Sequence, residues 1–424
     1  MTITSEVAAP VELAPVLKAP GRARRKRSLA WKLMGVFLIA GLLAFNAWSY
    51  WRDSRPLPDL DTISSWMVRE RYADAESALR EILRKSPHGA EARMMLARAL
   101  AGRGDVLNCA RQLHEVPFWS PLKAEALYRE GQAYLQIDRA RNAEAAWLAA
   151  IEDDPLHPVK PDLFHDICQG LLNLYAIEDR WEDAYPVMWT AYDHVVPVDR
   201  PVLLTMRMRP ELERVSPKES IAILGRYVAA DADDWEARRS LARAEQALSR
   251  PAEAARHFQA CLAGGRDDVR AWRDYLAMLL EEGELDAFLS VLNEAPKSAD
   301  SDAETWMFRG VAREKMEDWQ AAAEHFRKAI EINPVVPKYY YRLAMAEERL
   351  GLHDQAIAHR KRNKEMNDAR GQLSAAYADY FTALKANHSQ APDLAAACKR
   401  LAVICDTMGW SRAAQAWNRL AISP

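Results

Sequence analysis

The stretch that decides the fold runs from Ala303 to Pro334 and reads AETWMFRGVAREKMEDWQAAAEHFRKAIEINP. Apolar residues recur in it every three or four positions, which is the period of an α-helix with one buried face. Two segments of this kind are separated by the short polar link 315–318. The final proline ends the second segment, because it drives the preceding residue out of the helical region. The stretch therefore predicts a hairpin of two α-helices.

The same pattern recurs along the chain with a period of 34 residues. Trp272, Trp306 and Tyr340 occupy one phase, and a second phased run covers residues 72–155. Between the two runs, at 155–164, the phase slips by a few residues. A chance match would lose its phase after one step, so the recurrence predicts an array of stacked hairpins.

The pattern resembles the tetratricopeptide repeat, which has a large and then a small residue in its first helix, and a small, an aromatic and a small residue in its second. Five residues fill these positions in order: Trp306, Gly310, Ala322, Phe326 and Ala329. The resemblance covers roughly residues 61–424 and implies an all-α, right-handed superhelical solenoid of about ten hairpins. Phe288 stands where a small residue is usual, and Arg360 stands where an aromatic is usual. We expect less regular packing in those two units.

The N-terminal region has a different composition. Leu33 to Tyr50 contains no charged residue and would be about 27 Å long as a helix, enough to cross a bilayer. Lys and Arg precede this segment in a cluster at 22–27, whereas acidic residues dilute the basic residues that follow it. We therefore expect one transmembrane signal anchor with its N-terminus in the cytoplasm and the repeats outside it. The alternatives are a cleaved signal peptide, which the bulky Phe45 opposes, and a buried soluble helix.

These features divide the chain into five parts. They are a disordered basic cytoplasmic tail (1–28), the transmembrane signal anchor (29–51), a linker (52–60), the repeat solenoid (61–367), and an extra helix followed by a degenerate closing repeat (368–424). We expect the protein to be a single-pass protein of the cytoplasmic membrane.

The composition argues against several classes of function. The formal net charge is −3, whereas nucleic-acid-binding proteins normally carry a basic excess. The five cysteines are scattered and show no metal-ligand spacing, so we interpret them as packing residues and expect no metal. The sequence has no phosphate-binding glycine loop and no nucleophile elbow. We therefore expect neither a cofactor nor an enzymatic activity.

In a tetratricopeptide solenoid the first helix of each hairpin lines a concave groove, so the exposed residues of those helices are candidate partner contacts. In the middle of the array they form a basic strip of Arg209, Arg239, Arg243, Arg270 and Arg273. Nearer the N-terminus they are Arg98, Tyr128, Gln132, Gln169 and Asn173, and nearer the C-terminus Tyr341. Arginine binds carboxylates with two hydrogen bonds, so the strip favours a partner with an acidic segment. The alternative is that these arginines pair with glutamates of the chain at helical spacing, such as Glu236 and Glu245.

The resemblance implies a scaffold that binds a protein or peptide in its groove, and the N-terminal segment suggests a role in assembly of the cell envelope. A second hypothesis places the repeats in the cytoplasm, as a tethered adaptor that regulates envelope synthesis or proteolysis. A third is a module that binds a glycan or supports a glycosyltransferase. The family resemblance alone does not choose among them.

Overall fold

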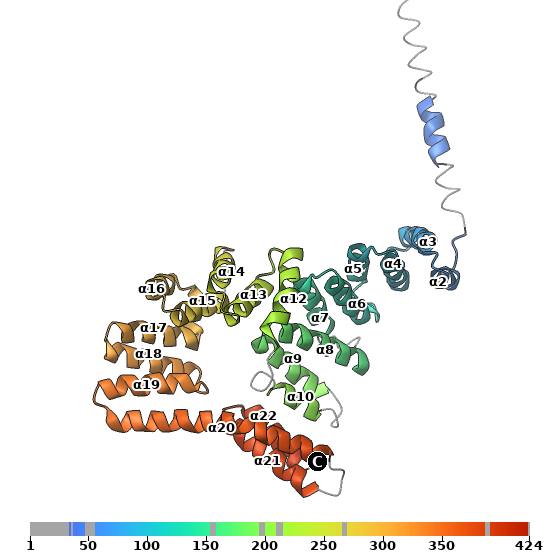
Figure 1. The fold of residues 1–424 in the computed structure, drawn as a ribbon. Helices are drawn as coiled ribbons and strands as arrows, with labels where there is room; N and C mark the ends of the chain where they lie inside the picture. Colours follow the sequence, from blue (N-terminus) through green and yellow to red (C-terminus); the bar gives the residue numbers. More distant parts are fainter. Residues whose placement is uncertain are drawn as a thin grey trace, which may run out of the picture. The chain divides into compact units, whose positions relative to one another are not determined.

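A computed structural model of the chain describes Met34 and residues 37–46, 56–152, 158–194, 200–208, 215–264, 269–385 and 391–422. Every regular element in these ranges is a helix (Figure 1). The chain divides into two compact units, residues 1–62 and residues 63–424. The described part of the chain is thus all-helical, as the period of the apolar residues predicted.

In the first unit, residues 37–46 form a helix whose side chains are exposed. No helix in the described ranges is both long and apolar enough to cross a membrane. The predicted span Leu33 to Tyr50 is described only at Met34 and at residues 37–46. The rest of that span, the tail 1–28 and most of the linker 52–60 lie outside the described residues.

From Leu60 onward most helices pack in pairs. After α2 (Leu60–Val68) and α3 (Tyr72–Lys85) come three hairpins: α4 (Ala90–Gly102) with α5 (Val106–His114), α6 (Lys123–Gln136) with α7 (Ala140–Ala150), and α8 (Pro161–Ile177) with α9 (Trp181–His194). α10 (Arg200–Met206) packs on α9, α12 (Pro217–Ala230) packs on the helix that follows it, and the remaining hairpins come after them. These five are α13 (Trp235–Ala247) with α14 (Pro251–Ala263), α15 (Val269–Glu281) with α16 (Leu285–Asn293), α17 (Ala303–Lys315) with α18 (Trp319–Ile332), α19 (Pro337–Arg349) with α20 (His353–Lys385), and α21 (Ala391–Thr407) with α22 (Ser411–Ile422). A short 3-10 helix, η2 (Lys297–Ser301), precedes α17.

Small residues let the two helices of a hairpin approach each other, as the repeat pattern predicted. A β-carbon added at Gly310 on α17 would lie 2.4 Å from Phe326 Cε1 on α18. A β-carbon at Gly131 on α6 would meet Trp147 Nε1 on α7 at 2.3 Å. Both glycines precede their aromatic residue by the same interval in the sequence. The same close approach therefore recurs in two hairpins that lie far apart in the chain.

The two departures from the repeat pattern are accommodated differently. Phe288 on α16 is fully buried and packs against Phe308, with ring centroids 5.9 Å apart. Its helix is short and is followed by the 3-10 turn η2. Arg360 on α20 lies at the surface, where it pairs with Glu348 at 3.1 Å.

The C-terminal part differs from the expected arrangement in one respect. We expected an extra helix to begin near residue 368, but α20 runs without interruption from His353 to Lys385. No proline interrupts this stretch, and pairs at helical spacing such as Lys364 with Asp368 support the backbone across the predicted boundary. The second helix of the α19–α20 hairpin and the expected extra helix are therefore one element.

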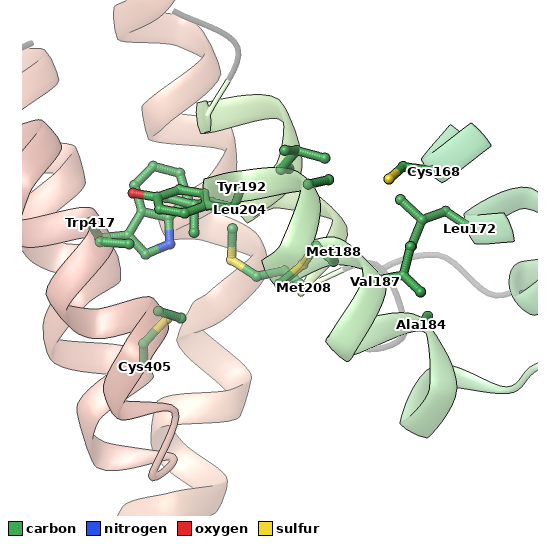
Figure 2. Packing of buried hydrophobic residues seen from close by; sticks show 14 of the residues in the cluster. Cys168, Leu172, Ala184, Val187, Met188, Tyr192, Leu204, Met208, Cys405 and Trp417 are labelled. Atoms are coloured by element: carbon green, nitrogen blue, oxygen red, sulfur yellow. The ribbon is translucent and has the colours of Figure 1, made fainter. Parts of the chain in front are cut away.

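The hairpin of α21 and α22 packs back onto α9 and α10. Tyr192, Leu204 and Met208 share one buried cluster with Cys405 and Trp417 (Figure 2). The Arg207 guanidinium lies between two rings, 4.0 Å from the Tyr185 centroid and 3.7 Å from that of Trp410. Arg412 on α22 pairs with Asp193 on α9 at 2.8 Å. Residues about 200 positions apart in the sequence are thus neighbours.

Candidate functional site

A groove lies between α6 and α8, the first helices of neighbouring hairpins. It encloses about 550 Å³, and its lining includes Tyr128, Gln132, Gln136, Asp166, Gln169 and Asn173. The indole of Trp147 also lines it and donates its N–H to the Tyr128 carbonyl at 3.0 Å. Trp147 approaches Gly170, where an added β-carbon would lie 3.2 Å from the ring. Trp147 therefore contacts the first helices of two successive hairpins, α6 and α8, and helps to position both.

Four carboxamide side chains in this groove, those of Gln132, Gln136, Gln169 and Asn173, are exposed to solvent. Each carboxamide can both donate and accept hydrogen bonds, as a peptide bond can. Burial and the charge of Asp166 raise the pKa of the Tyr128 phenol, which keeps this hydroxyl a neutral donor and acceptor. The groove thus offers several polar groups that an extended polypeptide backbone would satisfy.

Sequence analysis placed Tyr128, Gln132, Gln169 and Asn173 on the concave face, and the structure brings them together. It missed Gln136 and Asp166. Gln136 follows Gln132 by four residues, so the helical period places both on one face of α6 and could have predicted Gln136. Asp166 precedes Gln169 by three residues, which places the two on one face of α8.

The predicted basic strip is neutralised within the chain. Arg239 pairs with Asp274 at 2.8 Å and with Glu236 at 3.1 Å, and its side chain is 4% exposed. Arg243 pairs with Asp179 at 2.5 Å. Arg209 lies outside the described residues. Arg239 and Glu236 form the pairing at helical spacing that the sequence left open as an alternative. Arg243 and Arg273 instead pair with carboxylates of other hairpins, and Glu245 pairs with Arg250.

Three of the carboxylates that pair with this strip come from one short segment: Asp179 from the turn between α8 and α9, and Glu182 and Asp183 from the first turn of α9. Asp183 accepts a hydrogen bond from Arg270 at 2.8 Å, and Glu182 accepts one from Arg273 at 3.0 Å. Arg180 from the same segment is buried and bonds Glu144 and Glu178 at 2.8 and 2.7 Å. An acidic segment does lie against the arginine strip, and it belongs to this chain. Binding of a partner by these arginines stays a prediction, and that partner would compete with this segment.

One connected network includes all these groups. Five arginines take part: Arg180, Arg239, Arg243, Arg270 and Arg273. Eight carboxylates share them: Glu144, Glu178, Asp179, Glu182, Asp183, Glu236, Asp274 and Asp302. Carboxylates outnumber guanidinium groups, so the network as a whole is negative rather than basic.

The two remaining candidate residues lie elsewhere. Arg98 is exposed on α4. Tyr341 is 49% exposed and lines a cavity of about 540 Å³ with Lys338, Asn367 and Arg370. That cavity lies between α19 and α20, so it is separate from the α6–α8 groove and from the arginine strip.

The five cysteines are packing residues, as the sequence indicated. All five are buried and none is in a disulfide. Burial raises the pKa of Cys109 to about 11 and that of Cys168 to about 12. A thiol with so high a pKa is a poor nucleophile at neutral pH.

Comparison with known proteins agrees with the repeat pattern. Models of the tetratricopeptide repeat match residues 67–108, 239–303 and 303–334. No curated protein matches the chain. Among solved structures, MamA 41-end from Desulfovibrio magneticus RS-1 is 23% identical, over 40% of this chain and 97% of that one, with a TM-score of 0.32.

The human IFIT1 dimer with PPP-AAAA is 14% identical, over 79% of this chain and 90% of that one, with a TM-score of 0.35. Scores this low support no argument about the arrangement or the ligands of this chain. The repeat matches rest on the sequence itself and agree with the hairpins of the structure. The chain therefore contains tetratricopeptide repeats.

Proposed function

We propose that the protein is a non-catalytic scaffold that holds an extended segment of a protein partner in the α6–α8 groove. The four exposed carboxamides carry this proposal, because each can both donate a hydrogen bond to a polypeptide backbone and accept one from it. Tyr128 adds an amphipathic ring that is partly buried, a type of residue enriched where proteins bind each other. Tetratricopeptide repeats generally act as binding modules, which agrees with this assignment.

Site-specific photocrosslinking tests the groove directly. A benzophenone amino acid placed at Gln132 or at Gln169 in the full chain should give discrete adducts with a partner in intact cells. The matched control is the same amino acid at Gln355, which is exposed on α20 and outside the groove. Equal adduct patterns at all three positions, or none at Gln132 and Gln169, would refute the proposal.

We further propose that the N-terminal segment anchors the protein in the cytoplasmic membrane, with the repeats on the outer side in cell-envelope assembly. The uncharged stretch Leu33 to Tyr50 and the basic cluster before it support this topology. A reporter that is active only outside the cytoplasm, fused after Pro424, should be active in intact cells. Activity of a cytoplasmic reporter instead would overturn the topology and favour the tethered adaptor.

An acidic stretch in the partner fits the cavity at Tyr341 better than the arginine strip. Lys338 and Arg370 line that cavity without an acidic residue among its described lining residues. Lys338 also pairs with Glu304, and Arg370 takes part in an interaction within the chain, so both positive charges are shared. With the benzophenone amino acid placed at Tyr341, reversal of charge by Arg370→Glu should reduce the yield of adducts, whereas Arg256→Glu on the exposed face of α14 should not. No loss with Arg370→Glu would refute an acidic contact at this cavity.

A further inference from the structure

A second cavity, of about 490 Å³, lies where α8, α13 and α15 end and α12 packs against them. Its size is within the range of about 300–1,000 Å³ that is usual for small-molecule sites. Four carboxylates line it, from Glu178, Asp179, Asp274 and Glu281, and Arg243 is the sole cation among its described lining residues. The cavity wall therefore has an excess of negative charge.

Neighbouring arginines balance only part of that charge. Arg180 pairs with Glu178 at 2.7 Å, and Arg239 pairs with Asp274 at 2.8 Å. Arg243 is shared between Asp179 at 2.5 Å and Asp274 at 3.8 Å. Glu281 accepts a hydrogen bond from the neutral amide of Gln246 at 2.6 Å. The three helices α8, α13 and α15 also end here, and helix C-termini carry partial negative charge, whereas α12 begins here and its N-terminus carries partial positive charge. The three helix C-termini and the unneutralised Glu281 attract a cation into the cavity.

The cavity also contains an unsatisfied buried polar group. Ser240 on α13 lines it and is 3% exposed, and the hydroxyl oxygen of Ser240 has no hydrogen-bond partner. A buried hydroxyl without a partner destabilises a folded protein, because no hydrogen bond offsets the loss of its contact with water. A ligand that donates a hydrogen bond to Ser240 Oγ would remove that cost.

Glu178 pairs with Arg180 at 2.7 Å and contributes little to the negative charge of the cavity wall at neutral pH. It is 1% exposed, and burial together with the neighbouring carboxylates Asp234 and Glu144 raises its pKa to about 8, although Arg180 opposes the shift. At neutral pH this carboxyl is largely protonated. A cation bound beside it would favour the ionised form.

We propose that this cavity binds a primary ammonium group, supplied either by a lysine side chain of a protein partner or by a small free diamine. An ammonium has three donors in a compact head, which suits carboxylates on several walls and a hydroxyl acceptor between them. Its narrow alkyl stem would lie along Ala244, Ala247 and Ala277, which also line the cavity. The site is distinct from the α6–α8 groove and does not depend on the partner proposed there.

The test measures thermal unfolding of the full chain in detergent at about 150 mM salt, where unspecific surface attraction is screened. Two probes separate the sources: putrescine, and an acetylated, amidated Gly-Lys-Gly peptide compared with the same peptide carrying norleucine. A saturable rise in Tm is expected with at least one amine probe and not with the norleucine peptide. Putrescine binding indicates a free diamine, and binding of the lysine peptide alone indicates a partner side chain. The absence of a saturable rise with both amines overturns the proposal.

Two variants locate the binding. Glu281→Gln at the exposed mouth should weaken the amine roughly threefold to tenfold, because it removes a charged acceptor. Glu282→Gln, on the next and equally exposed residue, should leave the affinity unchanged. Ser240→Ala should weaken the amine while leaving the ligand-free Tm unchanged or higher, since it removes an unpaired hydroxyl. Equal affinities for Glu281→Gln and Glu282→Gln would place the amine elsewhere and refute the site.

Discussion

Two glycines in helices of this protein differ in how closely neighbouring side chains approach them. Gly310 lies under the ring of Phe326, and Gly225 on α12 has nothing within 4 Å of where a β-carbon would be. Both lie in helices with ordinary backbone angles, because neither is among the residues with positive φ. The same substitution at the two sites should therefore have opposite effects.

We expect Gly310→Ala to destabilise the fold by about 1–3 kcal/mol, because the methyl group overpacks the hairpin. Gly225→Ala should stabilise the fold by about 0.5–1 kcal/mol, since alanine is the better helix former and meets no neighbour. Denaturant unfolding of the two variants and the wild type measures both effects. An unchanged free energy of unfolding in Gly310→Ala would show that the two helices can move apart without loss of stability.

The buried carboxyl of Glu178 should make stability depend on pH. Its pKa is about 8 in the folded chain against an ordinary value of 4.5, so between these values the folded state binds more protons than the unfolded state. The stabilisation is complete below about pH 4.5 and is lost as the pH rises through about 8. Glu178→Gln should therefore flatten the fall in unfolding free energy between pH 5 and 8. An unchanged slope in the variant would show that other groups cause the dependence.

At the scale of elements, the C-terminal hairpin is held by a small number of side chains on α9 and α10. Arg207 follows α10 and lies between the rings of Tyr185 and Trp410. Trp417 on α22 is fully buried in the cluster shown in Figure 2, and its ring lies 5.0 Å from that of Tyr380 on α20. Arg207 is therefore a cation between two aromatic groups from segments that are far apart in the chain.

Arg207→Ala should loosen the hairpin of α21 and α22 from α9 and α10. Each cation–π contact contributes about 0.5–2 kcal/mol, so amide protons in α21 and α22 should exchange about tenfold faster or more. Arg256→Ala, which removes an exposed arginine on α14, is the matched control and should not change their exchange. Uniform acceleration over all helices would mean that Arg207 stabilises the whole fold rather than this docking.

At the scale of the whole repeat array, the arginine and carboxylate network connects hairpins that are not neighbours in the sequence. Asp183 and Glu182 on α9 accept hydrogen bonds from Arg270 and Arg273 on α15. In a simple solenoid each repeat contacts only its neighbours. Here the network adds contacts between residues 87 and 91 positions apart, so unfolding should be more cooperative than in a simple array.

Arg180→Ala should reduce the free energy of unfolding by about 3–5 kcal/mol at pH 7, because it leaves carboxylates buried without their cation. Arg129→Ala breaks an exposed pair with Glu125 and should change it by less than about 1 kcal/mol. Equilibrium unfolding in urea, followed by circular dichroism, measures both. A loss below 1 kcal/mol with Arg180→Ala would show that water enters the network and replaces the arginine.

The sequence by itself determined the helical hairpins. Their period depends on contacts within one repeat, such as that of Gly310 with Phe326, and these recur wherever the pattern recurs. It also placed Tyr128 and Gln132 in the groove, because the helical period decides which residues share a face. The sequence did not indicate that α20 continues past residue 367. A helix that continues carries no local signal of its own, whereas a helix end is marked by a proline or a capping residue.

Only the tertiary structure decided the environment of the arginine strip. Asp179 and Glu182 are separated from Arg243 and Arg273 by 64 and 91 residues, and no local pattern connects them. Their contact depends on how successive hairpins stack after the phase slip between the two runs of repeats. The return of Trp410 to Arg207 depends on the same stacking. Periodicity specifies each hairpin, whereas small changes of angle between hairpins add up along the array and decide which distant side chains meet.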